Sequence, residues 1–90
     1  MFRREDDMVV KEFTEYVLKT CKRMPLITVY SNKTSDYPNK YAARMFDVNE
    51  RTNYVVLGDT LDEVRNSIPQ GMHRMNRRPE DDAVILETYL

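Results

Sequence analysis

The chain has 90 residues, with 14 basic and 15 acidic side chains, so its net charge of −1 gives no overall field to draw it onto nucleic acid or an anionic membrane. Apolar residues make up 41% of the chain and only two residues are glycine, which predicts a single compact domain over residues 1–90. The chain has a single cysteine, which excludes an internal disulfide. One cysteine and one histidine together are too few ligands for a structural zinc site, so we expect no metal and no cofactor. No segment reaches the length of a membrane span, and we expect a cytoplasmic protein.

The first predicted element is an amphipathic helix over residues 8–24, because its apolar residues recur at a spacing of 3.6 on one stripe. Asp6 or Asp7 can cap its start, and Pro25 ends it. Proline favours extended geometry before it, so the apolar residues 26–30 read as the first strand.

The next segments predict a loop and a hairpin. Residues 31–39 are dense in turn formers, which indicates an exposed loop. Residues 40–46 then alternate in the manner of a strand, with Ala42, Arg44 and Phe46 on one face. A turn over residues 47–51 leads into a third strand that begins at Tyr54, so the second and third strands form a hairpin.

A sharp joint between a strand and a helix follows. The β-type run ending at Leu57 is broken by Gly58 and Asp59, and Thr60 then stands three residues before Glu63, the spacing of a capping box. A short helix over residues 60–68 is therefore predicted.

Beyond this helix, residues 72–76 form a short extended piece and residues 77–82 a polar turn. Residues 83–90 start with consecutive apolar side chains, which suits an interior strand. The predicted fold class is α+β, with an N-terminal amphipathic helix, an antiparallel sheet of about four strands and a second short helix, in the order α-β-β-β-α-β. The helices would cover one face only, which leaves a homodimer open as a cover for the other.

The sequence offers no catalytic constellation. Cys21 falls on the apolar stripe of the first predicted helix, where a thiol behaves as a small hydrophobic group, and His73 is read as a surface residue of a polar strand. We therefore expect a non-catalytic protein rather than an enzyme.

Two exposed segments are the candidate contact regions for another protein. In the loop, Tyr37 is expected to be at least partly exposed, as an anchor flanked by Asp36 and followed by Lys40; the alternative is that its ring folds back over the core. The second region is a charged segment over residues 73–82, whose candidate residues are His73, Arg74, Arg77 and Arg78. These arginines also leave a nucleic-acid-binding function as the alternative, although the following Glu80, Asp81 and Asp82 can neutralise them.

The segment Val-Val-Leu-Gly-Asp-Thr-Leu-Asp-Glu-Val over residues 55–64, preceded by the strand over residues 40–46, resembles the β-β-β-α-β module of HicB-type antitoxins. The resemblance covers about a third of the chain. It implies a protein that binds and blocks a partner. The chain departs from that family in its helix before the first strand and in lacking the family's DNA-binding extension. In length and charge density it is also similar to small proteins of bacteriophages and mobile elements, which implies a regulator or inhibitor of a host protein.

Overall fold

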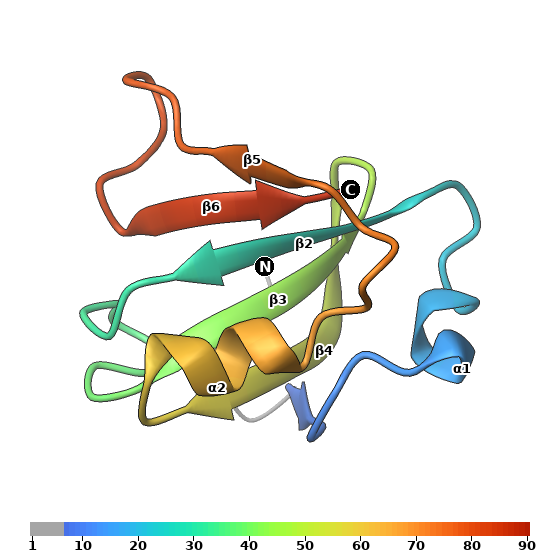
Figure 1. Ribbon diagram of the computed structural model, residues 1–90, viewed down its shortest axis with the longest axis horizontal. Helices are drawn as coiled ribbons and strands as arrows, with labels where there is room; N and C mark the ends of the chain where they lie inside the picture. The colour runs from blue at the N-terminus through green and yellow to red at the C-terminus, as the bar shows by residue number, and fades with distance from the viewer. Residues whose placement is uncertain (1–6) are drawn as a thin grey trace.

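The computed structural model describes residues 7–90, which form one six-stranded sheet and two short helices (Figure 1). The elements follow in chain order as β1 (Met8–Val9), α1 (Glu15–Leu18), β2 (Pro25–Tyr30), β3 (Tyr41–Asp47), β4 (Glu50–Gly58), α2 (Leu61–Asn66), β5 (Arg74–Asn76) and β6 (Ile85–Tyr89). The strand order across the sheet is β1-β4-β3-β2-β6-β5.

The prediction of a long N-terminal helix over residues 8–24 is wrong. Only α1 is helical there, because the backbone on both sides of it is bonded to other parts of the molecule. The Val10 N–H donates to the Val55 carbonyl at 2.9 Å, and the Phe13 N–H donates to the Ser67 carbonyl at 3.0 Å. After α1, the Asp47 carboxylate accepts three consecutive N–H groups, those of residues 22–24. These N–H groups are thus not available to helical carbonyls four residues earlier.

The sheet also corrects the predicted order α-β-β-β-α-β. It is a mixed sheet, because β1 pairs in parallel with β4, with Met8 opposite Tyr54 and Val9 opposite Val55, whereas the other pairs are antiparallel. The extended piece expected at residues 72–76 is present as β5. The interior position expected for the last strand is confirmed, since β6 lies between β2 and β5.

The β3–β4 hairpin is tighter and longer than expected. Its loop is only Val48 and Asn49, and β4 begins at Glu50 rather than at Tyr54. The register shifts between Arg44 and Phe46, where three residues of β4 (52–54) face Met45 alone, which is a β-bulge. The Thr52 hydroxyl donates to the Met45 carbonyl at 2.6 Å and holds the bulge in place.

The joint between β4 and α2 is built as predicted. Thr60 is the N-cap of α2, and its hydroxyl oxygen accepts from the Glu63 N–H at 3.2 Å. Gly58 lies at the end of β4, where a Cβ would lie only 3.0 Å from Val64 Cγ2 and 3.1 Å from Glu63 Cβ and would force these neighbours to shift. The glycine thus permits α2 to pack close to the strand that precedes it.

Both helices contribute to the core on one face of the sheet. Val17 of α1 and Val64 of α2 join a single buried cluster with the inward side chains of β2 and β3, among them Ile27 and Met45. An ion pair between the partly exposed Arg65 and the buried Glu87 also links α2 to β6. Arg65 donates two hydrogen bonds to the Glu87 carboxylate, at 2.8 and 3.0 Å. These bonds lower the pKa of Glu87 although burial acts in the opposite direction.

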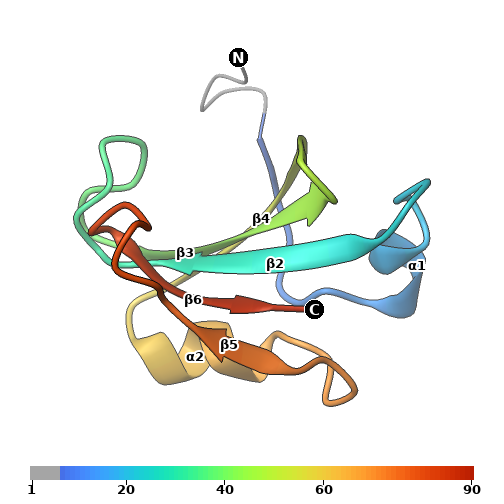
Figure 2. The same ribbon diagram turned by 90° about the horizontal axis from the view of Figure 1, so that it is seen from above.

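Among residues 7–90, the opposite face of the sheet carries no helix, and we call it the helix-free face. In Figure 2, α2 lies below the sheet, and the β2–β3 loop and the β3–β4 turn rise above it at opposite ends. Among residues 7–90, no helix is long and apolar enough to cross a membrane.

The cap of α2 provides a test of the joint. Thr60→Ala removes the hydroxyl that satisfies the Glu63 N–H, and we expect it to lower the free energy of unfolding by about 1 kcal/mol. Urea denaturation followed by circular dichroism measures this value. Thr60→Ser keeps the cap and should stay close to wild type, and equal losses in the two variants would contradict the assignment.

Candidate functional site

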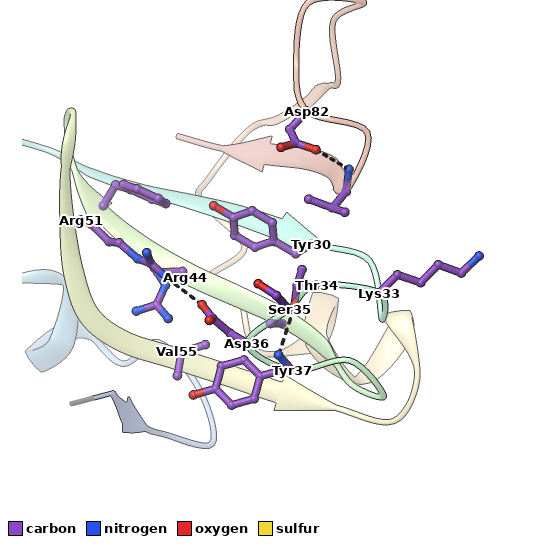
Figure 3. Close-up of a pocket in the computed structure, with 13 residues that line it drawn as sticks. Tyr30, Lys33, Thr34, Ser35, Asp36, Tyr37, Arg44, Arg51, Val55 and Asp82 are labelled. Carbon is purple, nitrogen blue, oxygen red and sulfur yellow. Dashed lines mark hydrogen bonds and ion pairs between the residues drawn. The ribbon is translucent and has the colours of Figure 1, made fainter. Parts of the chain in front are cut away.

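The helix-free face holds a hollow of about 520 Å³ whose floor is formed by β2, β3 and β4 and whose walls include the β2–β3 loop (Figure 3). The lining residues are Tyr30, Lys33, Thr34, Ser35, Asp36, Tyr37, Ala42, Arg44, Phe46, Arg51, Val55, Asp82 and Val84. A shallower hollow of about 320 Å³ shares Tyr30 and Phe46 with it and reaches Ile85 and Thr88 on β6. Together the two hollows extend across the open face.

A buried ion pair forms one end of the hollow. The side chains of Arg44 and Asp7 are only 4% and 1% exposed. Arg44 donates to both Asp7 oxygens, at 2.9 and 2.7 Å, and to the Thr52 carbonyl at 3.0 Å. The Tyr37 hydroxyl donates to Asp7 Oδ2 at 2.7 Å. Asp7 thus joins the start of β1, the centre of β3 and the β2–β3 loop.

The environment of Asp7 favours its charged form. Burial alone would raise its pKa, but the hydrogen bonds from Arg44 and Tyr37 outweigh burial, and the positive charges of Arg44 and Arg51 act in the same direction. The net result is a pKa below the ordinary value of 3.8. The carboxylate is therefore ionised at neutral pH and neutralises Arg44.

A second, weaker ion pair lies beside the first. Arg51 Nη2 donates to Asp36 Oδ2 at 3.2 Å, and the two side chains are 33% and 44% exposed. Arg51 stands on β4 opposite Phe46, so its stem borders the apolar part of the floor. The pair is open to solvent and to a ligand.

Tyr30 supplies a phenol to the middle of the hollow. Figure 3 shows its hydroxyl pointing toward the side where Arg44 and Arg51 lie, whereas Lys33 extends away from the hollow. Burial raises the pKa of Tyr30, and the nearby arginines offset this only in part. The hydroxyl is therefore a neutral donor at physiological pH, and it has no hydrogen-bond partner among residues 7–90.

The structure places only part of the predicted contact loop at the hollow. Asp36 and Tyr37 line it, but the expectation that Tyr37 is exposed is wrong, because Tyr37 is 7% exposed. Its ring packs in a small cluster with Ala42 and Val55, and its hydroxyl is bonded to Asp7. Lys40 lies outside the hollow and forms an ion pair with Asp59.

The charged segment lies at the other edge of the sheet, on and after β5. His73 exchanges two backbone hydrogen bonds with Leu90. Arg74 lies 3.9 Å from Glu87, Arg77 donates to the Asp81 carbonyl at 2.9 Å, and Arg78 lies 3.4 Å from Glu80. The structure therefore does not bring this segment together with Asp36 and Tyr37 into one site. Acidic side chains lie within 4 Å of Arg74 and Arg78, and Arg77 donates to a backbone carbonyl.

Sequence reasoning missed Asp7, Tyr30, Phe46 and Arg51 as site residues. One signal was present, because the alternation over residues 40–46 places Arg44 between Ala42 and Phe46 on one face, and an arginine inside an apolar strand needs a buried acid. Its partner is Asp7, for which the sequence pattern instead predicts a role as a helix cap. Asp6, the other candidate cap, lies outside the described residues.

Cys21 and His73 do not form a pair. The Cys21 thiol donates to the Phe46 carbonyl at 3.9 Å, and burial, together with the nearby Asp47, raises its pKa. The thiol is therefore protonated at neutral pH, as a packing residue would be. Within residues 7–90, no three His, Cys, Asp or Glu side chains converge as metal ligands.

No family model, curated protein or solved structure matches the chain. The resemblance to the HicB-type antitoxins therefore stays a prediction.

The buried pair predicts a specific dependence of stability on pH. Asp7→Asn leaves Arg44 without a counter-charge, and we expect a loss of about 3 kcal/mol at neutral pH. Because the folded pKa of Asp7 is lowered, its contribution is complete above the ordinary carboxyl pKa and is lost as the pH falls through the folded pKa. The gap in unfolding free energy between wild type and variant should thus be constant at neutral pH and narrow below about pH 4. Urea titrations at several pH values measure it.

Asp59→Asn is the matched control for this experiment, because Asp59 is 71% exposed. It should change stability by no more than about 0.5 kcal/mol. A gap for Asp7→Asn that persists unchanged into acid would show that the lost stability does not come from the carboxylate charge.

The nucleic-acid alternative is tested at the charged segment. Replacing Arg74, Arg77 and Arg78 together by alanine should leave folding nearly unchanged, because all three are exposed. Because Arg74 and Arg78 each have a glutamate beside them, we expect wild type and variant alike to bind a labelled RNA or DNA only negligibly at low salt in fluorescence anisotropy. Salt-dependent binding that the triple variant loses would establish the alternative instead.

Proposed function

We propose that the chain is a non-catalytic protein-interaction module that holds a segment of a partner protein in the hollow of its helix-free face. The observation that carries this proposal is the hollow itself, on the side of the sheet opposite the helices, where the partly exposed Tyr30 and Phe46 adjoin the buried Ala42 and Val55. Its volume of about 520 Å³ falls within the range of ligand sites. Aromatic residues and arginine are the side chains enriched at the energetic centres of protein interfaces, and both occur here.

The framework of the hollow supports the same proposal. The buried Asp7 carboxylate fixes the β2–β3 loop against β3 through Tyr37 and Arg44, so one wall is held in place before a partner arrives. A site that is already ordered loses less conformational entropy on binding. We further propose a cytoplasmic regulator or inhibitor of a host protein, in line with the resemblance to partner-blocking antitoxins.

The proposal is tested by placing a bulky charged side chain on the helix-free face. Thr88 lines the second hollow and lies opposite Met75 and Thr28 in the sheet, so Thr88→Lys introduces a long charged side chain without removing a core residue. A partner is captured from a lysate of the source organism, identified and purified, and its dissociation constant is then measured by calorimetry. We expect Thr88→Lys to weaken binding by at least about tenfold, because a charge would be desolvated in the interface.

Thr20→Lys makes the same chemical change just after α1, outside both hollows, and should leave the dissociation constant unchanged. Thermal melts of both variants establish that they are folded. Equal affinities of wild type and Thr88→Lys for the purified partner would remove the helix-free face as the binding surface.

A further inference from the structure

We propose that Arg51 binds an acidic side chain of the partner protein, and that Asp36 is the intramolecular group which this side chain displaces. The inference rests on the proposed function, because it names the chemistry that the hollow recognises.

The first reason is the unused capacity of Arg51. A guanidinium carries five N–H groups, and Arg51 uses one of its nitrogens in a single bond to Asp36, at 3.2 Å. Arg44 differs, since two of its nitrogens make three shorter bonds to Asp7 and Thr52 and its side chain is 4% exposed. Arg51 is 33% exposed and therefore remains accessible to a second carboxylate.

The second reason is the position of Asp36. It lies on the β2–β3 loop and is 44% exposed, so its carboxylate can return to water when another acid takes its place. Exposed ion pairs contribute little to stability, and the exchange has a correspondingly small cost. Asp36 thus acts as a built-in competitor for Arg51.

The third reason is the set of groups beside Arg51. The Tyr30 hydroxyl points toward this end of the hollow and is free to donate to a carboxylate, as no residue among 7–90 accepts from it (Figure 3). Phe46 lies opposite Arg51 and is partly exposed, so it can cover an apolar neighbour of the acid. The fitting ligand is therefore an acidic residue next to an apolar one.

A cationic ligand fits this end of the hollow less well. Arg44 and Arg51 stand on the floor strands, whereas Asp36 and Asp82 lie in the flanking loops and already accept hydrogen bonds, Asp36 from Arg51 and Asp82 from the Val84 N–H. A carboxylate that reaches the floor meets the unused N–H groups of Arg51, whereas a cation would meet the Arg51 guanidinium beside an Arg44 that Asp7 already neutralises.

The experiment uses two blocked peptides, acetyl-Phe-Glu-Leu-amide and acetyl-Phe-Gln-Leu-amide, which differ only in the charge of the middle side chain. Each is titrated at millimolar concentration into the folded chain, and NMR follows the Arg51 Nε–H and the Tyr30 ring. We expect the glutamate peptide to shift both signals in a saturable manner and to bind at least about tenfold more tightly than the glutamine peptide.

Two variants should then move the affinity in opposite directions. Arg51→Gln should lower the affinity for the glutamate peptide by at least about tenfold. Asp36→Asn should raise this affinity by about two- to fivefold, because it removes the competing carboxylate. Their matched controls lie outside the hollow. Arg77→Gln removes an arginine after β5, and Asp59→Asn removes the acid that pairs with Lys40, and neither should alter the affinity.

Equal responses to the two peptides, the absence of any response, or weaker binding by Asp36→Asn would overturn the proposal. A short oligonucleotide that shifts Arg51 more strongly than the glutamate peptide would assign the site to phosphate instead. Self-association in sedimentation that Arg51→Gln abolishes would make the occupant a second copy and would also overturn it. If Thr88→Lys abolishes binding of the purified partner while Arg51→Gln leaves it unchanged, the helix-free face remains the binding surface and only the acidic anchor fails.

Discussion

The ion pair between Asp7 and Arg44 is the interaction on which the helix-free face depends. Removing two charges from water is costly, and the cost is met here by a bidentate contact, by the Thr52 carbonyl and by the Tyr37 hydroxyl. Because these partners come from four separate segments, their arrangement fixes β1, the β2–β3 loop, β3 and β4 relative to one another. The geometry of the hollow follows from this arrangement.

The bulge in β4 explains how such a pair is built. Three residues of β4 (52–54) face one residue of β3, so the Thr52 carbonyl is turned away from the ladder and accepts from Arg44 instead. At the end of the bulge, Tyr54 and the following Val55 pair with β1, and this pairing places Asp7 beside the arginine. The two faces of the sheet thus differ: one packs against the helices, and the geometry of the other is set by the ion pair between Asp7 and Arg44.

Local patterns were sufficient for the parts of the fold that depend on neighbouring residues. The Thr60 cap, the hairpin after Lys40 and the strand at the end of the chain follow from capping chemistry, alternation and apolar content. The prediction for the N-terminal segment failed although its apolar spacing is helical, because its backbone N–H groups bond to carbonyls far away in the sequence, such as those of Val55 and Ser67. For the same reason, only part of the site could be predicted from the sequence. Arg44 signalled a missing acid, but only the tertiary fold identifies that acid as Asp7 and buries Tyr37 over it.

The placement of β6 has a consequence for the order in which the molecule forms. β2 has β3 on one side, close in sequence, but on the other side it pairs with β6 from the far end of the chain. During synthesis the β2 edge stays unpaired until the last strand is available, and β1 must likewise wait for β4. Sheets closed by such distant pairings fold slowly, typically over milliseconds to seconds, because loop-closure entropy is lost before the contacts form. In that interval the exposed edge of β2 is the site most prone to pairing with another chain, and chaperone binding would protect the molecule there.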